Sequence, residues 1–156
     1  MKVFVGNNLK YNTHSFLIES FKNQFKKNVC ESDIDRTDLG KPFFKDKTLP
    51  FFSLSHSGKY IVCVFDQNNI GIDIQRIRRM PNNLVKRYLK TNSSDLIKRI
   101  IEWTRFESYG KRIGVGLPFE EDYSKGYFLT TKEIKDYIIT VCTEKITKQK
   151  LEIIYL

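Results

Sequence analysis

The chain has 156 residues, of which 40% are hydrophobic and 29% charged, and its 27 lysines and arginines against 18 aspartates and glutamates give a formal net charge of +9. This composition excludes a largely disordered protein, and the longest apolar runs, such as 60–65, are too short to span a bilayer. The sequence shows no charged-then-apolar leader, so we expect a cytoplasmic protein that does not bind a membrane. The positive excess favours an anionic partner without choosing among nucleic acid, a phosphorylated cofactor and an acidic protein.

The numbers and spacing of the cysteines and histidines argue against disulfide bonds and against a zinc or other transition-metal site. Cys30, Cys63 and Cys142 are widely spaced and odd in number, which predicts neither a disulfide framework nor a zinc site. With only His14 and His56 available as imidazole ligands, a transition-metal site is not expected either.

Hydrophobic spacing and turn residues predict the elements of the first half. Alternating or β-rich runs indicate strands, apolar residues at helical spacing indicate a helix, and closely spaced Gly and Pro indicate a loop. In chain order these are a strand at 1–5, a helix at 14–27, a loop at 38–42, a hairpin of strands 51–55 and 60–65 around a turn at 56–59, and a strand at 70–75.

The second half predicts helices followed by strands. The expected helices are 82–90 and 93–113, and the expected strands are 126–131, 137–142 and 151–155. This order is typical of an α+β fold. We expect a single domain, 1–156, built from two similar small α/β halves at about 1–69 and 70–156.

The strand at 70–75 carries an unusual acidic residue. Its alternation places Ile70, Ile72 and Ile74 on one face and Gly71, Asp73 and Gln75 on the other. Taken alone, Asp73 is most simply a solvent-facing residue of an edge strand. Gly71 beside it would let a bulky ligand approach the backbone.

Two other polar features are equally ordinary when each is taken alone. Glu107 and Lys111 lie one helical turn apart, a spacing that as a surface pair contributes only about 0.2–0.5 kcal/mol. His56 falls in the predicted hairpin turn, where a histidine usually has no catalytic role.

Taken together, four segments follow a known pattern. They are a G-K-P loop at 40–42, an S-H-S-G turn at 55–58, a G-I-D strand at 71–73, and a helix at 103–111 that matches W-x-x-K-E-x-x-x-K except at its first lysine. In order and rough spacing the set resembles the signature of the 4′-phosphopantetheinyl transferase superfamily. The resemblance covers about 39–117, and the layout looks like a shortened member of the larger, pseudo-dimeric surfactin-synthetase type.

The resemblance implies an enzyme. Such an enzyme transfers the 4′-phosphopantetheine moiety of coenzyme A to a serine of an apo acyl or peptidyl carrier protein and releases adenosine 3′,5′-bisphosphate. The reaction depends on Mg²⁺ and serves fatty-acid, polyketide or nonribosomal peptide synthesis. The implied partners are therefore coenzyme A and an acidic carrier protein, with no nucleic acid and no membrane, and the implied state is a monomer.

The resemblance also assigns residues. Asp73, Glu107 and Lys111 are the expected catalytic residues, and Glu107 is the expected acceptor of the serine proton. The expected metal ligands are Asp73, Glu107 and Gln75. The residues expected to bind coenzyme A are Lys41, Pro42, Ser55, His56 and Lys111.

The chain departs from the pattern at three places, of which Gln75 and the short leading segment support an alternative. Gln75 stands where many relatives carry a third acidic residue, Phe106 replaces the usual lysine before the glutamate, and the segment before the first helix is short. The alternative is a weak or inactive relative that binds coenzyme A or a carrier protein without transfer. A nucleic-acid-binding domain, suggested by the charge, lacks helix-turn-helix, zinc and aromatic RNA-binding signatures.

Overall fold

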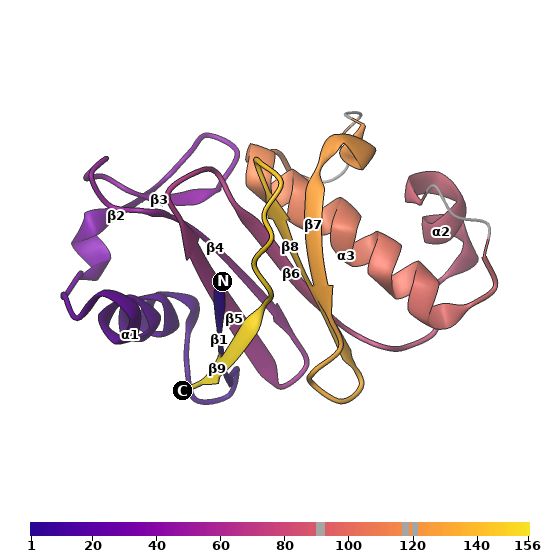
Figure 1. Ribbon diagram of the computed structural model, residues 1–156, viewed down its shortest axis with the longest axis horizontal. Coiled ribbons are helices and arrows are strands. Elements are labelled where there is room, and N and C mark those ends of the chain that lie inside the picture. The colour runs from indigo at the N-terminus through magenta and orange to yellow at the C-terminus, as the bar shows by residue number, and fades with distance from the viewer. Residues whose placement is uncertain (90–92, 117–118, 120–121) are drawn as a thin grey trace.

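The protein is described by a computed structural model that covers residues 1–89, 93–116, 119 and 122–156 (Figure 1). Its elements confirm the predicted mixed α+β class. In chain order they are β1 Lys2–Asn7, α1 Thr13–Phe25, η1 Glu31–Asp33, β2 Ile34–Arg36, β3 Pro42–Phe44, β4 Phe51–Ser57, β5 Tyr60–Asp66, β6 Gly71–Arg76, α2 Asn82–Tyr88, α3 Leu96–Ile113, η2 Tyr123–Lys125, β7 Tyr127–Thr131, β8 Tyr137–Thr143 and β9 Glu152–Tyr155.

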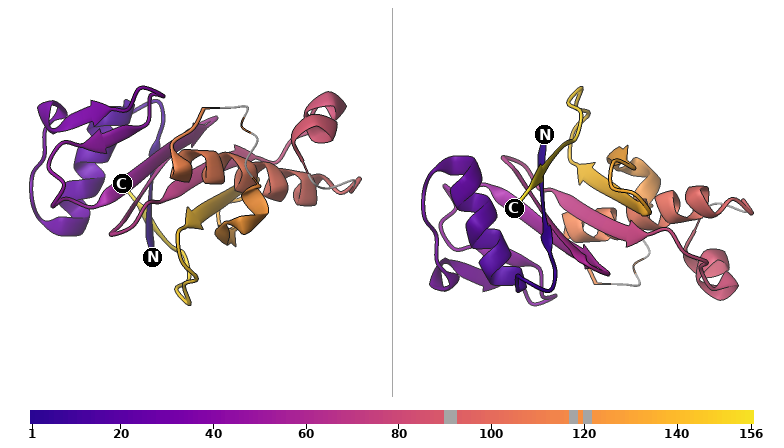
Figure 2. Two further views of the ribbon diagram at one scale, coloured as in Figure 1. Left: turned by 90° about the horizontal axis from the view of Figure 1, so that it is seen from above. Right: turned by 90° about the horizontal axis from the view of Figure 1, so that it is seen from below.

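Two main sheets form the body of the molecule. One has the strand order β4-β5-β1-β9 and the other β6-β8-β7, while β2 and β3 form a separate small ribbon. Helix α1 lies against the first sheet and α3 against the second, on opposite sides of the two sheets (Figures 1 and 2). β9 pairs in parallel with β1, so the C-terminal strand belongs to the first sheet, and the division into halves at 1–69 and 70–156 stays a prediction.

The alternation predicted for β6 is confirmed by the core. Ile70, Ile72 and Ile74 are fully buried and share one cluster with inward-facing valines of β1 and β5, such as Val5 and Val64. The aromatic residues of α1 and of the first sheet form a separate cluster on that sheet's other face. The two sheets therefore pack against each other through β-branched side chains, with one helix outside each sheet.

Several predicted boundaries were wrong. His56 and Ser57 belong to β4, and the hairpin turn is tighter than expected because Gly58 takes a positive φ of 53°. β3 begins at Pro42, inside the predicted loop, and the whole β2–β3 ribbon was missed because each strand has only three residues. The end of the helix predicted at 82–90 falls partly on residue 90, which lies outside the described residues.

Helix α3 is one unbroken helix with a clear signal at each end. The Asp95 side chain caps its start by accepting hydrogen bonds from the backbone N–H groups of Ile97 and Lys98. Gly114 ends it in the left-handed conformation, with φ of 82°. In the part of the chain that the structure describes, no helix is both long and apolar enough to cross a membrane.

Gly71 lets α3 approach β6, not the ligand that the sequence suggested. A Cβ atom at Gly71 would overlap the Ser108 carbonyl oxygen and lie 2.5 Å from the Arg112 backbone nitrogen. Both are backbone atoms of α3, which cannot move without the whole helix. The missing side chain therefore sets the distance between β6 and α3.

We expect Gly71→Ala to destabilise the protein by about 3 kcal/mol, the upper part of the range for overpacking a core. Urea unfolding would measure the loss. Gly116→Ala is the matched control, because a Cβ at Gly116 meets nothing within 4 Å and should leave the free energy of unfolding unchanged. Equal stability of the two variants would contradict the close contact between β6 and α3.

Candidate active site

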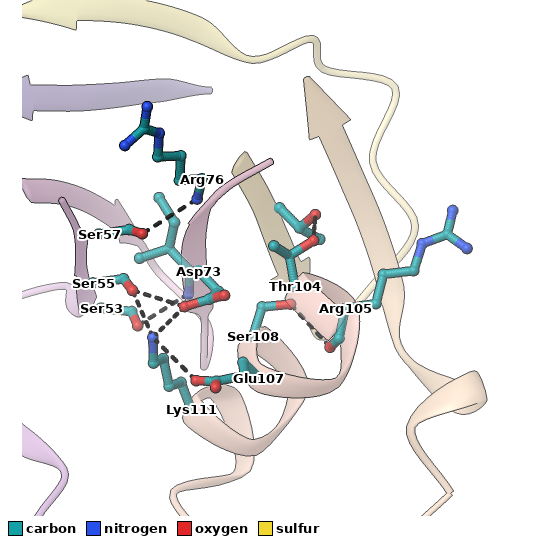
Figure 3. Close-up of polar contacts among 12 residues, drawn as sticks. Ser53, Ser55, Ser57, Asp73, Arg76, Thr104, Arg105, Glu107, Ser108 and Lys111 are labelled. Carbon is teal, nitrogen blue, oxygen red and sulfur yellow. Dashed lines mark hydrogen bonds and ion pairs between the residues drawn. The ribbon is translucent and has the colours of Figure 1, made fainter. Parts of the chain in front are cut away.

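Four of the predicted site residues, Asp73, Glu107, Lys111 and Ser55, meet at the junction of β4, β6 and α3 (Figure 3). Lys111 Nζ lies 2.7 Å from both Asp73 Oδ1 and Ser55 Oγ, and Ser55 Oγ donates to Asp73 Oδ1 at 2.7 Å. The carboxylate of Glu107 lies 3.9 Å from Lys111 Nζ. Strand, strand and helix thus place two carboxylates around one ammonium group.

Asp73 is not the solvent-facing residue that its strand alone suggested. Only 1% of it is exposed, because α3 covers the face of β6 that carries Asp73. Its Oδ1 atom is bonded by Lys111 and Ser55, whereas Oδ2 is buried and has no hydrogen-bond partner. A buried carboxylate oxygen without a partner is costly, and a bound cation would relieve that cost.

The side chain of Glu107 has a pKa near neutral pH. Burial raises its pKa to about 7, the nearby Asp73 carboxylate adds to the rise, and the Lys111 ammonium opposes it. Glu107 therefore exchanges a proton in the physiological range. A carboxyl with such a pKa is a good acceptor for the proton of an incoming hydroxyl.

The oxygen donors of the site suit a hard divalent cation. Asp73 Oδ2 and the Glu107 carboxylate are the type of ligand that Mg²⁺ prefers, and Mg²⁺ commonly uses one or two carboxylates with phosphate and water. Gln75, half-buried, follows two residues along β6 and so points to the same side as Asp73. The described residues hold no group of three or more His, Cys, Asp or Glu that could bind a metal.

Lys41 and Pro42 lie beside this cluster. Lys41 Nζ donates to the Arg112 carbonyl at 2.7 Å, which ties the 40–42 loop to the last turn of α3. Burial, and then the Arg112 guanidinium, lower the pKa of Lys41 to about 8. Lys41, Pro42 and Lys111 line one cavity of about 230 Å³.

His56 and Ser55 line a second cavity, of about 240 Å³, which Pro42 also lines. It also contains His14 and Arg36, so three potentially cationic side chains border it. Sequence reasoning missed Arg36, which reaches this place because β2 pairs with β3 and sets Arg36 opposite Pro42. A strand of three residues leaves too weak a pattern to be found in advance.

The residues around Glu107 explain the departure at Phe106. Phe106 is 3% exposed and stacks on Phe119, with ring centroids 4.4 Å apart, so it belongs to an aromatic cluster behind the helix. Arg105 pairs with Glu102 at 2.8 Å and points away from Asp73 (Figure 3). Neither Phe106 nor Arg105 places a positive charge beside Asp73. Lys111 therefore supplies the ammonium group that contacts Asp73.

The curated proteins to which the sequence is similar include several 4′-phosphopantetheinyl transferases. The chain is 30% identical over 109 residues to the 4′-phosphopantetheinyl transferase Sfp of Bacillus subtilis strain 168, an overlap of 64% of this chain and 49% of the relative. It is 33% identical over 95 residues to another 4′-phosphopantetheinyl transferase of Bacillus subtilis, 54% of this chain and 42% of the relative. The transferase gsp of Aneurinibacillus migulanus is 29% identical over 92 residues, 53% of this chain and 38% of the relative.

These relatives, with the α+β fold, support membership of the chain in the 4′-phosphopantetheinyl transferase superfamily. No protein-family model matches it. The chain spans about half the length of the curated relatives that it matches.

Proposed function

We propose that the protein is a magnesium-dependent 4′-phosphopantetheinyl transferase that modifies a serine of an apo acyl or peptidyl carrier protein with the phosphopantetheine arm of coenzyme A. One observation carries the proposal. Asp73, Glu107 and Lys111 meet at one place, and a buried oxygen of Asp73 has no partner there.

Asp73 and Glu107 would hold the metal ion, with the amide oxygen of Gln75 or water as a further ligand. Bound Mg²⁺ supplies neutralisation of the pyrophosphate charge, which lowers the barrier to phosphoryl transfer. The structural support is the unpartnered Asp73 Oδ2 atom and the raised pKa of Glu107, since a cation would stabilise both carboxylates in their charged form.

The reaction joins the serine oxygen of the carrier to the phosphorus that bears the pantetheine arm. The bond from that phosphorus to the oxygen of the leaving adenosine 3′,5′-bisphosphate breaks. Glu107 accepts the serine proton, and Lys111 lies against the negative charge that develops on the phosphates. The short Lys111–Asp73 pair holds the ammonium group in place before the substrate binds.

Coenzyme A would lie along the two cavities that border the 40–42 loop. Lys41 and Pro42 would contact its nucleotide, while Ser55 and His56 would donate to its phosphates, with Arg36 and His14 as further neighbours. The net charge of +9 suits an acidic carrier protein. We further propose that the protein acts as a monomer in the cytoplasm.

The decisive experiment is incubation with coenzyme A, Mg²⁺ and a panel of apo carrier proteins, followed by mass spectrometry of the carriers. We expect addition of one phosphopantetheine arm, and its loss when Mg²⁺ is chelated. If the folded protein adds no phosphopantetheine arm to any of the carriers, the proposal is wrong. Calorimetric binding of coenzyme A without addition would instead support the inactive relative.

A further inference from the structure

Strands β4 and β6 lie side by side although they belong to different sheets. Each is the edge strand of its own sheet, and in the part of the chain that the structure describes no backbone ladder joins them. The site depends on this contact, because Ser55 lies on β4 and Asp73 on β6. Some other interaction must fix one strand against the other.

Serine side chains make that connection. Ser53 Oγ accepts a hydrogen bond from the Ile72 backbone N–H at 3.1 Å, and Ser57 Oγ accepts one from the Arg76 backbone N–H at 3.2 Å (Figure 3). From Ser53 to Ser57 on β4 and from Ile72 to Arg76 on β6 is four residues each, and the residue numbers increase in the same direction on both strands. β4 and β6 therefore run in the same direction, with serine hydroxyls in place of the carbonyl groups of a parallel ladder.

The strand geometry explains why alternate serines are needed. In the antiparallel pair of β6 with β8, every second N–H of β6 points away from β8. Ile72 and Arg76 are two of these positions, and Ile74 lies between them. Ser55, which lies between Ser53 and Ser57, instead donates its hydroxyl hydrogen to Asp73 and accepts from Lys111.

The burial of this contact makes the outer serines important. Ser53 is 5% exposed and Ile72 is fully buried, so without Ser53 the Ile72 N–H would lose its partner away from water. Ser57 secures the other end of the contact, where β6 reaches the surface. The two bonds lie on either side of the Ser55–Asp73 bond.

We infer that Ser53 and Ser57 are positioning residues, which hold β6 in one register against β4 so that Asp73 meets Ser55 and Lys111. The catalytic part of this inference rests on the proposed transferase function. A shift of β6 by one residue would turn Asp73 to the opposite face of the strand, so the register decides whether the site exists.

Amide hydrogen exchange followed by NMR tests the inference without any activity. We expect Ser53→Ala to speed exchange at Ile72 about tenfold or more, and Ser57→Ala to do the same at Arg76. Ser20→Ala is the matched control. Ser20 is also fully buried, but its hydroxyl bonds the Phe16 carbonyl within α1, so its loss should leave Ile72 and Arg76 unchanged.

Transfer kinetics test the catalytic consequence. In Ser53→Ala we expect kcat to fall about tenfold while the KM for coenzyme A stays within about twofold, as for a displaced catalytic group. Ser53→Thr, which keeps the hydroxyl, should restore both the rate and the slow exchange at Ile72. A rise in KM with normal exchange would mean that Ser53 touches the substrate, and would overturn the inference.

The two proposals fail in different ways. If the unmodified protein transfers nothing, the transferase proposal fails, and the exchange rates still decide whether the serines fix β6. Wild-type exchange at Ile72 and Arg76 in the alanine variants would refute the positioning role. If Ser53→Ala does not fold, Ser57→Ala at the half-buried end tests the same role by the same measurements.

Discussion

Asp73→Asn is expected to reduce transfer by about 10²–10³-fold, the range typical for removing one charge-stabilising group from an active site. The asparagine keeps the shape of the side chain, but its oxygen carries no full charge for a metal ion or for Lys111. Mass spectrometry of the carrier at saturating coenzyme A measures the rate. Because the substitution is nearly isosteric, the fold should persist, and circular dichroism verifies this.

The same variant tests the proposed metal site independently of transfer. Mg²⁺ should raise the melting temperature of the unmodified protein, since a ligand that binds only the folded state stabilises it, and should not raise that of Asp73→Asn. Asp95→Asn is the control, because asparagine caps a helix as well as aspartate and Asp95 lies at the far end of α3. Full activity of Asp73→Asn would refute the assignment of Asp73 as metal ligand.

Glu107→Gln should lose most of its transfer activity and yet, without metal at pH 8, be more stable than the unmodified protein. The substitution removes the proposed proton acceptor and one proposed metal ligand, so we expect a loss of transfer as large as that for Asp73→Asn. It also removes a buried negative charge beside Asp73, which in the metal-free protein is unfavourable. Exchange of one carboxylate oxygen of Glu107 for an amide nitrogen would thus lower the activity and raise the stability.

The stability gain depends on pH in a definite direction. The folded state holds the Glu107 proton more tightly than the unfolded chain, so this group stabilises the fold below pH about 4.5, and the contribution is lost as the pH rises through about 7. Relative to Glu107→Gln, the metal-free protein should lose about 3 kcal/mol between pH 4.5 and 8. Urea unfolding without metal at both pH values measures this difference.

Glu102→Gln is the matched control on the same helix. Both Glu102 carboxylate oxygens are bonded, to Arg105 at 2.8 Å and to the Tyr123 hydroxyl at 3.2 Å, so its charge is favourable. This variant should be less stable than the unmodified protein at pH 8 and should retain transfer. If Glu107→Gln loses stability at pH 8 as Glu102→Gln does, the raised pKa of Glu107 is wrong.

The sequence predicted the face of each β6 residue but not what would cover it. Alternation correctly separated Ile72 and Ile74 from Asp73, because a strand has a period of two residues. It could not reveal that α3 packs over Asp73, since that depends on the close approach of Gly71 to Ser108 and Arg112, which lie far along the sequence. Asp73 alone was therefore misread as exposed.

The candidate site was predicted in part, through the order of four short segments. Lys111 and Ser55 are 56 residues apart, and no local pattern predicts their 2.7 Å contact. Arg36 was missed because its strand is too short to show alternation. The hydrogen bonds of Ser53 and Ser57 to β6 could not be predicted either, because Ser53 falls in a predicted strand and Ser57 in the predicted turn, with no local sign of a partner on 70–75.

The close contact of Gly71 with α3 divides the site into two mechanical units. β6 and α3 are packed backbone against backbone, so Asp73, Glu107 and Lys111 are carried by one closely packed pair of elements. Ser55, His56 and Arg36 belong to the other unit, built on the first sheet and its β2–β3 ribbon. A change in the angle between the two sheets would move Ser55 relative to Asp73 and Lys111, and the bonds of Ser53 and Ser57 to β6 oppose such a change.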